Sequence, residues 1–283
     1  MVELKDLKKN YSDFSLDLSF VIPEGRVSGL VGKNGAGKST TIKAILGLIR
    51  PDDGSVSVFG RESAKLTYQD KQNMGVALAE SGFSAYLTIR QITKILKNLY
   101  GRFDEQRFLD LCGQLNLPLD KQVKEFSTGM KAKLRVITAL CHKAKLLIMD
   151  EPTSGLDVEA RHEILDMLRN YLAENEDCSI LISSHISSDL ENLCDDIYLI
   201  HDGRMILHED TNEILERYGV LKVDESTYEN MDKSHVLGSR KESFGYSCFT
   251  DEKQYYAENY PGIIIEKGNI DDLILMMTKG EKI

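Results

Sequence analysis

The fold is decided by the stretch Gly32-Lys33-Asn34-Gly35-Ala36-Gly37-Lys38-Ser39-Thr40. An apolar run at residues 26–32 precedes it and predicts a strand, and residues 38–49 follow with apolar side chains at helical spacing. Strand, glycine-rich turn and helix in this order are the context that a phosphate-binding loop requires. The alternative is a glycine-rich turn that only links a strand to a helix, but the full pattern in this context favours nucleotide binding.

Each part of this loop has a physical reason to bind a nucleotide. The glycines let backbone N–H groups converge on the phosphates, and the N-terminus of the helix adds the positive end of its dipole. Lys38 supplies a point charge to the β- and γ-phosphates, and the hydroxyl of Ser39 is a predicted ligand of Mg²⁺. The predicted nucleotide ligands in the loop are Gly32, Asn34, Gly35, Ala36, Gly37, Lys38, Ser39 and Thr40.

A second motif places two carboxylates at the end of an apolar strand. Residues 146–149 are continuously apolar, and Asp150 and Glu151 follow them directly. Acids at the carboxyl end of a parallel strand face the crevice where ligands bind. We expect Asp150 to hold Mg²⁺, through water, and Glu151 to be the general base that activates the attacking water in ATP hydrolysis. Without the phosphate loop, an acidic pair at this place would more often begin a loop or cap a helix.

The order of the elements predicts an α/β fold. Short apolar runs bounded by turn residues predict strands at residues 2–7, 15–21, 26–32 and 55–59. Helical periodicity dominates residues 87–112, with a break near 100–102, and residues 130–142. Runs at 145–149 and 178–183, with a helix at 159–172 between them, predict buried parallel strands joined by right-handed crossovers.

The amino-acid composition changes after Glu216, where polar residues dominate up to about residue 256. We therefore predict a main domain at residues 1–216, with a helical subdomain at about 87–142, and a small α+β appendage at 217–283. Residues 244–249 and 262–266 are the expected strands of this appendage, and Asn269 with Asp272 resembles a helix N-cap with its reciprocal acid.

Three further motifs follow the phosphate loop: residues 126–130 (Phe-Ser-Thr-Gly-Met), residues 150–157 (Asp-Glu-Pro-Thr-Ser-Gly-Leu-Asp) and Ser184-His185. In this order they resemble the nucleotide-binding domains of ABC transporters over about residues 1–216. The resemblance implies a P-loop NTPase fold of ABC type, with a mixed sheet, an antiparallel β subdomain and an α-helical subdomain. It also implies that residues 126–130 are the signature motif, in which Ser127 and Gly129 cap the ATP of the opposite subunit.

The same resemblance implies further roles. Residues 154–157 form the loop that crosses the dimer interface, and His185 is the switch histidine that contacts the γ-phosphate. Tyr11 matches the aromatic residue that stacks on adenine, which suits a π-face; the alternative is a half-buried tyrosine near a strand end. Residues 82–88 and the helix after them are the surface that docks the membrane subunit.

The sequence departs from the family pattern at two places. The signature has Thr128 where a glycine is commonest and Met130 where glutamine is frequent, but its serine and glycine remain. Ala79 stands where the family has the glutamine that helps to bind Mg²⁺ and senses the membrane partner, with Glu80 beside it. We expect Glu80 to substitute as a metal ligand.

Composition limits the partners of the chain. The 283 residues carry a formal net charge of -10, which argues against nucleic acid as a partner because a polyanion would repel the chain. The five cysteines are scattered without metal or redox spacing, as expected of reduced cytosolic thiols. No secretory signal and no apolar run of about 18 residues is present, so a transport pathway would lie in another chain.

These observations predict an ATP-binding, ATP-hydrolysing subunit with ATP and Mg²⁺ as cofactors, peripheral on the cytoplasmic face of a bacterial cell membrane. Its predicted partners are a second copy of itself or a homologous ATPase subunit, and an integral membrane permease. The sequences of residues 123–131 and 270–275 resemble those of bacterial exporter subunits that are encoded apart from their permease. Such subunits handle hydrophobic compounds or amphipathic, antimicrobial peptides. The alternatives are an importer subunit, a regulatory module without turnover, and a non-transport ABC ATPase. The appendage either helps dimerisation, shields cargo or only stabilises the subunit.

Overall fold

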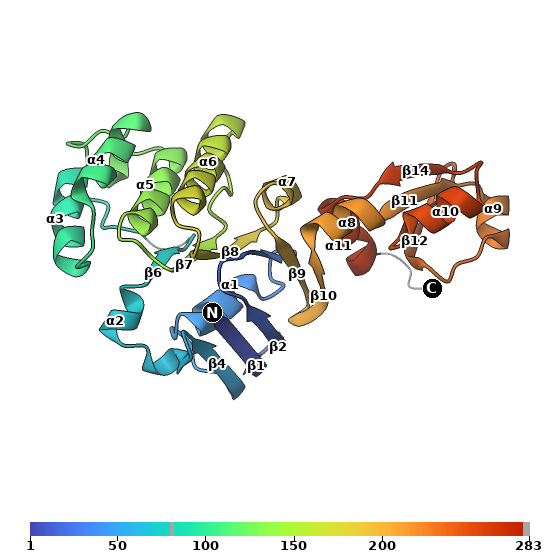
Figure 1. The fold of residues 1–283 in the computed structure, drawn as a ribbon, viewed down its shortest axis with the longest axis horizontal. Helices are drawn as coiled ribbons and strands as arrows, with labels where there is room; N and C mark the ends of the chain where they lie inside the picture. The colour runs from blue at the N-terminus through green and yellow to red at the C-terminus, as the bar shows by residue number, and fades with distance from the viewer. Residues whose placement is uncertain (80–81, 280–283) are drawn as a thin grey trace.

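The computed structural model describes residues 1–79 and 82–279 (Figure 1). The strands of its large sheet are β1 (Val2–Asn10), β2 (Ser15–Ile22), β3 (Val27–Val31), β4 (Asp53–Val58), β5 (Arg61–Glu62), β6 (Met74–Ala77), β7 (Leu146–Asp150), β8 (Ser179–Ser184), β9 (Asp196–His201) and β10 (Arg204–Asp210). Within the described residues these strands form one mixed sheet in the order β5-β4-β1-β2-β10-β9-β3-β8-β7-β6.

One half of the sheet is parallel. Strands β9, β3, β8, β7 and β6 pair in parallel, and every residue of β3, β7 and β8 is buried. Strands covered on both faces need no alternation of polar residues, which explains their continuous apolar sequences. The predicted parallel α/β core is therefore confirmed.

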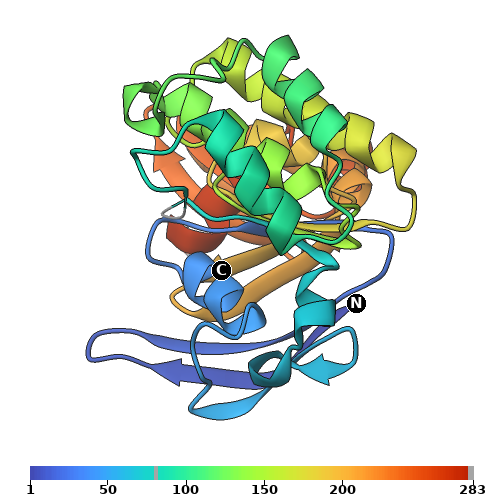
Figure 2. The ribbon, with the colours of Figure 1, turned by 90° about the vertical axis from the view of Figure 1, so that its left-hand side faces the viewer.

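The other half of the sheet is antiparallel. Strands β5, β4, β1 and β2 pair antiparallel, and β2 alternates exposed and buried residues along its whole length. This alternation is typical of a sheet with one solvated face. The antiparallel part joins the parallel part through the pairing of β2 with β10, at Asp17 and Arg204. Figure 2 shows these blue strands on the opposite side of the molecule from the green helices.

Helices cover the parallel half. They are α1 (Lys38–Ile45), α2 (Tyr68–Lys71), α3 (Ile89–Leu99), α4 (Glu105–Gln114), α5 (Thr128–Leu140), α6 (Val158–Glu174), α7 (Ser187–Glu191) and α8 (Thr211–Arg217), with short 3₁₀ helices at Ser63–Lys65 and Val123–Glu125. α3 to α6 lie together in Figure 1. Side chains cap several of their N-termini: Thr88 caps α3, Asp104 caps α4, Ser127 caps α5 and Asp157 caps α6.

Two glycines set the positions of helices. α5 lies so close to β6 that a Cβ at Gly75 would collide with the carbonyl oxygen of Ala139. α1 ends at Ile45, earlier than the predicted end at residue 49. Gly47 takes a φ of +67° just beyond it, and a side chain there would collide with the backbone of Ser63. The chain turns away because glycine accepts this left-handed conformation without steric cost.

Residues 219–279 build a second, antiparallel sheet in the order β12-β13-β11-β14. Its strands are β11 (Gly219–Val223), β12 (Val236–Glu242), β13 (Gly245–Thr250) and β14 (Ile264–Lys267), and its helices are α9 (Glu225–Asn230), α10 (Lys253–Asn259) and α11 (Ile270–Lys279). The two expected strands and the helix after Asn269 are present, and the Asn269 side chain accepts from the backbone N–H of Asp272 at 2.8 Å. β11 and β12 were not predicted, because polar residues flank both strands in the sequence.

The second sheet shares its core with the rest of the chain. A single hydrophobic cluster joins buried residues of α5, α6 and one face of β7 and β8 to five residues of the C-terminal part: Tyr218, Val220, Phe249, Ile270 and Leu273. Tyr256 belongs to a smaller hydrophobic cluster, which lies between the strands and helices of residues 219–279. Residues 217–279 are therefore packed onto the main body through apolar contacts, in addition to the chain connection.

The five cysteines are all buried and unpaired. Burial raises the pKa of the Cys112, Cys141 and Cys178 thiols to about 12 and that of Cys248 to about 11, because a thiolate is poorly solvated there. These thiols are packing residues. Over residues 1–79 and 82–279, no helix combines the length and apolar character needed to cross a membrane.

Leu273→Ala tests the shared core. Leu273 is fully buried in the cluster that spans both parts, so we expect the free energy of unfolding to fall by about 3 kcal/mol. Unfolding in urea, monitored by far-UV circular dichroism, should show this loss as a shift of a single transition. The control Ile264→Ala, at a side chain that is 67% exposed, should change the value by less than about 0.5 kcal/mol. A separate early transition for residues 217–279 alone would contradict a shared core.

Candidate nucleotide-binding site

The predicted phosphate loop connects β3 to α1 and encloses the lysine ammonium group. Gly37 is the N-cap of α1 with a φ of +115°, and a Cβ there would lie 2.6 Å from Leu16 and 3.0 Å from Phe14. Lys38 is only 5% exposed, and its Nζ donates to the carbonyl oxygens of Gly32 at 2.6 Å and Lys33 at 3.3 Å. The loop therefore holds a fixed positive charge beside the N-terminus of a helix, which is an anion-binding arrangement.

A cleft of about 200 Å³ opens at this loop. Its lining residues are Phe14, Lys33, Asn34, Gly35, Gly37, Lys38, Ser39, Thr40 and Glu151. Six of the predicted loop ligands line it. Gly32 lies at the end of β3, and Ala36 is buried beneath the loop, where its N–H donates to Lys33.

Two hydroxyl groups meet the carboxylate of Asp150. Ser39 Oγ lies 3.3 Å from Asp150 Oδ1, and Ser183 Oγ donates to the same oxygen at 2.6 Å. Asp150 is 6% exposed at the carboxyl end of β7. A carboxylate and a hydroxyl side by side are the hard oxygen donors that Mg²⁺ prefers. The described residues contain no group of three or more acidic, histidine or cysteine side chains that could hold a metal, and Glu80 lies outside the described residues.

Glu151 joins the lysine to the predicted switch histidine. Its Oε1 lies 3.2 Å from Lys38 Nζ, and its Oε2 lies 2.6 Å from His185 Nδ1. Its backbone takes a φ of +50°, which is unusual for a residue other than glycine. Two hydrogen bonds stabilise this conformation: the N–H of Glu151 donates to the carbonyl oxygen of Ser183 at 3.1 Å and to Ser183 Oγ at 3.0 Å. The structure thus brings Lys38, Glu151 and His185 together from three separate parts of the chain.

Ser183 is a site residue that the sequence analysis missed. It is fully buried near the end of β8, and its hydroxyl contacts both the Asp150 carboxylate and the Glu151 N–H. A hydrophilic residue at the end of an otherwise apolar strand, two positions before His185, is the signal that could have identified it.

Two aromatic residues lie near the loop, and only one lines the cleft. Phe14 is a lining residue, whereas Tyr11 is 48% exposed, with its ring centroid 6.4 Å from that of Phe14 and 5.9 Å from Lys9 Nζ. Phe14 therefore offers an apolar face next to the phosphate loop that the sequence analysis did not single out. The stacking of Tyr11 on adenine stays a prediction.

The predicted signature motif does not reach the cleft of its own chain. Ser127 Oγ accepts the N–H of Met130 at 3.2 Å and caps α5, and Gly129 lies near Leu156 and Ala160. Among the described residues, none of 126–130 lines the cleft at the phosphate loop. Ser127 is exposed at a helix N-terminus, where backbone N–H groups can meet an anion.

A second groove lies where the membrane subunit was expected to dock. Its volume is about 330 Å³, and its lining residues are Ala79, Gly82, Phe83, Ala85, Val123, Lys131, Leu134 and Arg135. The Arg135 guanidinium donates to the carbonyl oxygens of Ala79 and of Leu78, and burial lowers its pKa. These hydrogen bonds connect α5 to the residues just after β6. The groove is therefore lined in part by α5, the helix that begins at the predicted signature motif.

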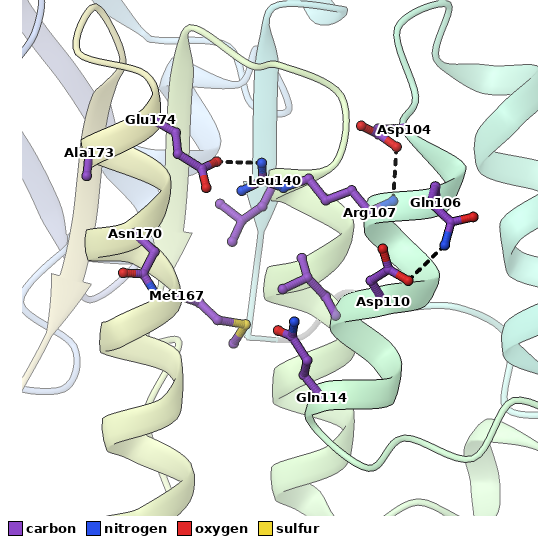
Figure 3. A pocket seen from close by; sticks show the side chains of 11 residues that line it. Asp104, Gln106, Arg107, Asp110, Gln114, Leu140, Met167, Asn170, Ala173 and Glu174 are labelled. Carbon is purple, nitrogen blue, oxygen red and sulfur yellow. Dashed lines mark hydrogen bonds and ion pairs between the residues drawn. The ribbon is translucent and has the colours of Figure 1, made fainter.

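A larger cavity, of about 650 Å³, lies elsewhere, beside α4 and α6 (Figure 3). Its lining is mostly polar, and Arg107 forms an ion pair with Glu174 across it at 2.5 Å. None of the predicted site residues lines this cavity. Its size therefore does not make it the nucleotide site.

Comparison with known proteins identifies a family. A family model described as "ABC transporter" matches residues 16–154. The chain is 36% identical over 211 residues to the bacitracin transport ATP-binding protein BcrA of Bacillus licheniformis, covering 73% of this chain and 68% of that protein. It is also 36% identical over 222 residues to the lantibiotic transport ATP-binding protein SrtF of Streptococcus pyogenes, covering 76% and 94%. A solved ATP-binding subunit of an ABC transporter superposes with a TM-score of 0.68 at 31% identity, covering 76% and 91%.

Ser183→Ala should lower kcat for ATP hydrolysis about tenfold, because Asp150 loses the hydroxyl that orients it. Steady-state kinetics with varied Mg²⁺ measure this effect. The control is Ser179→Ala on the same strand, where a fully buried hydroxyl donates to the Pro23 carbonyl oxygen at 3.1 Å. The kcat of the control variant should equal that of the wild type. Equal losses of kcat in the two variants would mean that Ser183 only stabilises the strand.

Proposed function

The chain belongs to the ABC transporter family as an ATP-binding subunit, and we propose that it hydrolyses Mg-ATP to drive export through a separate membrane permease. The observation that carries the proposal is the contact of Glu151 with two other residues at the phosphate loop: its Oε1 lies 3.2 Å from Lys38 Nζ and its Oε2 lies 2.6 Å from His185 Nδ1. A buried lysine, a carboxylate and an imidazole at a cleft of this kind supply charge stabilisation and a base for phosphoryl transfer to water.

Nucleotide binding changes the partner of Lys38. The ammonium group of Lys38 forms an ion pair with Glu151 Oε1 at 3.2 Å. The β- and γ-phosphates of ATP bring a larger negative charge to the same place and compete for the ammonium group. Glu151, still contacted by His185 Nδ1, then has a free oxygen to accept a proton from the attacking water.

Mg²⁺ is the metal that fits the oxygens present. Ser39 and Asp150 would hold it, with Ser183 orienting the carboxylate. When bound, Mg²⁺ would supply positive charge beside the phosphate oxygens. The described residues would supply one carboxylate and one hydroxyl to such an ion.

The site is completed by a second subunit. Ser127 and Gly129 stand at the N-terminus of α5 but do not line the cleft of their own chain. We assign them to the γ-phosphate of ATP held by the partner, which is a second copy or a homologous ATPase subunit. Residues 154–157 lie in the same region and form part of this contact between subunits.

The groove at Phe83 and Arg135 is the docking surface for the permease, at the cytoplasmic face of the membrane. Tyr86 beside it is 69% exposed, and Lys124 Nζ lies 5.1 Å from its ring centroid. An exposed aromatic ring next to a partly apolar groove is typical of a protein interface.

Because two relatives are named for bacitracin and lantibiotic transport, we propose a hydrophobic compound or an amphipathic peptide as the exported substrate.

Glu151→Gln should lower kcat for ATP hydrolysis more than about a hundredfold, because the amide cannot accept the proton of the water. Binding of Mg-ATP, followed with a fluorescent analogue, should persist. Turnover that is undiminished in this variant would remove Glu151 from the role of base.

Lys38→Ala should weaken ATP binding itself, since the fixed charge for the β- and γ-phosphates is gone. The same fluorescence titration separates this loss from the loss of turnover in Glu151→Gln. An unchanged dissociation constant would contradict the assignment of the phosphate loop.

A further inference from the structure

The short helix α7 lies between the nucleotide site and the C-terminal sheet. It begins two residues after His185, and its Leu190 lies against β3, the strand that leads into the phosphate loop. A Cβ at Gly29 of β3 would lie 3.3 Å from Leu190 and 3.0 Å from Cys194. Because no larger side chain fits there, α7 has a close and fixed distance to β3.

One side of α7 is bound to the segment that follows Glu151. Asp189 is fully buried, and its Oδ2 accepts from Thr153 Oγ1 at 2.6 Å. Its Oδ1 accepts from the Arg161 guanidinium, which also donates to Ser188 Oγ. A buried carboxylate with these partners fixes the helix against residues 153–161, because breaking such a pair would leave a buried charge.

The other side of α7 is bound to the C-terminal sheet. Glu191 Oε1 accepts the backbone N–H of Ile270 at 2.9 Å, at the first residue of α11. A carboxylate at a helix N-terminus also interacts favourably with the helix dipole. Ile270 and Leu273 are fully buried in the same hydrophobic cluster as Leu190 and Cys194. Polar and apolar contacts therefore both join α11 to α7.

From this geometry we propose that the C-terminal sheet sets the position of His185 through α7, with Glu191 as the positioning residue. The proposal rests on the proposed function of His185 and Glu151. The contact of Glu191 with Ile270 holds one end of α7, and Asp189 holds its side toward residues 153–161. His185 Nδ1 must stay 2.6 Å from Glu151 Oε2 to orient the base, so a shift of α7 changes turnover without changing the phosphate loop.

Glu191→Ala in the full chain tests this link. We expect kcat for ATP hydrolysis to fall about fivefold, with KM for ATP within about twofold, because a charge-assisted hydrogen bond is lost outside the phosphate-binding residues. Hydrogen exchange should become faster at the backbone amides of residues 185–191. Glu191→Gln keeps an acceptor oxygen and should restore most of the rate and the protection.

The matched control is Asp224→Ala, which removes the cap of α9 in the same sheet, where Asp224 Oδ1 accepts the Thr227 N–H at 2.7 Å. It should lower the stability of the sheet by a similar amount but leave kcat and exchange at 185–191 unchanged. Equal losses of kcat in both variants, or wild-type kcat and wild-type exchange in Glu191→Ala, would overturn the proposal.

A double variant separates the route through His185 from other routes. In a His185→Ala background, Glu191→Ala should cause no further fall in the residual kcat, because the two changes act on one step. A further fivefold fall would contradict positioning through His185. If the wild-type chain lacked ATPase activity, the proposed function would fail, and the exchange comparison would still decide whether Glu191 orders residues 185–191.

Discussion

The contact between Lys38 and Glu151 is the interaction on which the site depends. The two side chains are 5% and 14% exposed and lie 3.2 Å apart. A buried charge of either kind is costly alone, so each is held with its partner. The lysine is further bound by two carbonyl oxygens of its own loop, and the carboxylate by His185. These contacts fix both charged groups at the predicted phosphate loop.

The part of the site that depends on short spacing in the sequence could be predicted. The phosphate loop, the acidic pair after β7 and the histidine after β8 all follow strands whose apolar runs are easy to recognise, and parallel strands bring their ends to one edge. Ser183 was missed although a hydrophilic residue at the end of an apolar strand marks it, because its contacts with Asp150 and Glu151 are tertiary. Phe14 was missed because its place beside the cleft leaves no local pattern. β11 and β12 were missed because polar residues surround them, and packing against the rest of the chain decides their structure. Glu80 lies outside the described residues, and its role stays a prediction.

The second sheet gives the subunit a feature beyond the family's catalytic core. It is bound to the main body by a shared hydrophobic cluster and by the Glu191 contact at α7. The same helix reaches residues 153–161 through Asp189. A single short element thus contacts the C-terminal sheet, the histidine segment and the region expected at the interface between subunits. This placement is the basis for the proposal that the C-terminal sheet positions His185.

The central claim is that one chain carries half of each ATP site and that ATP closes two chains together. The most direct test is the mass of purified Glu151→Gln protein, measured by light scattering after size exclusion, with and without Mg-ATP. The account predicts a monomer without nucleotide and a dimer with Mg-ATP, because binding persists while turnover stops. A protein that binds ATP yet remains a monomer would contradict a site completed by a second copy of this chain.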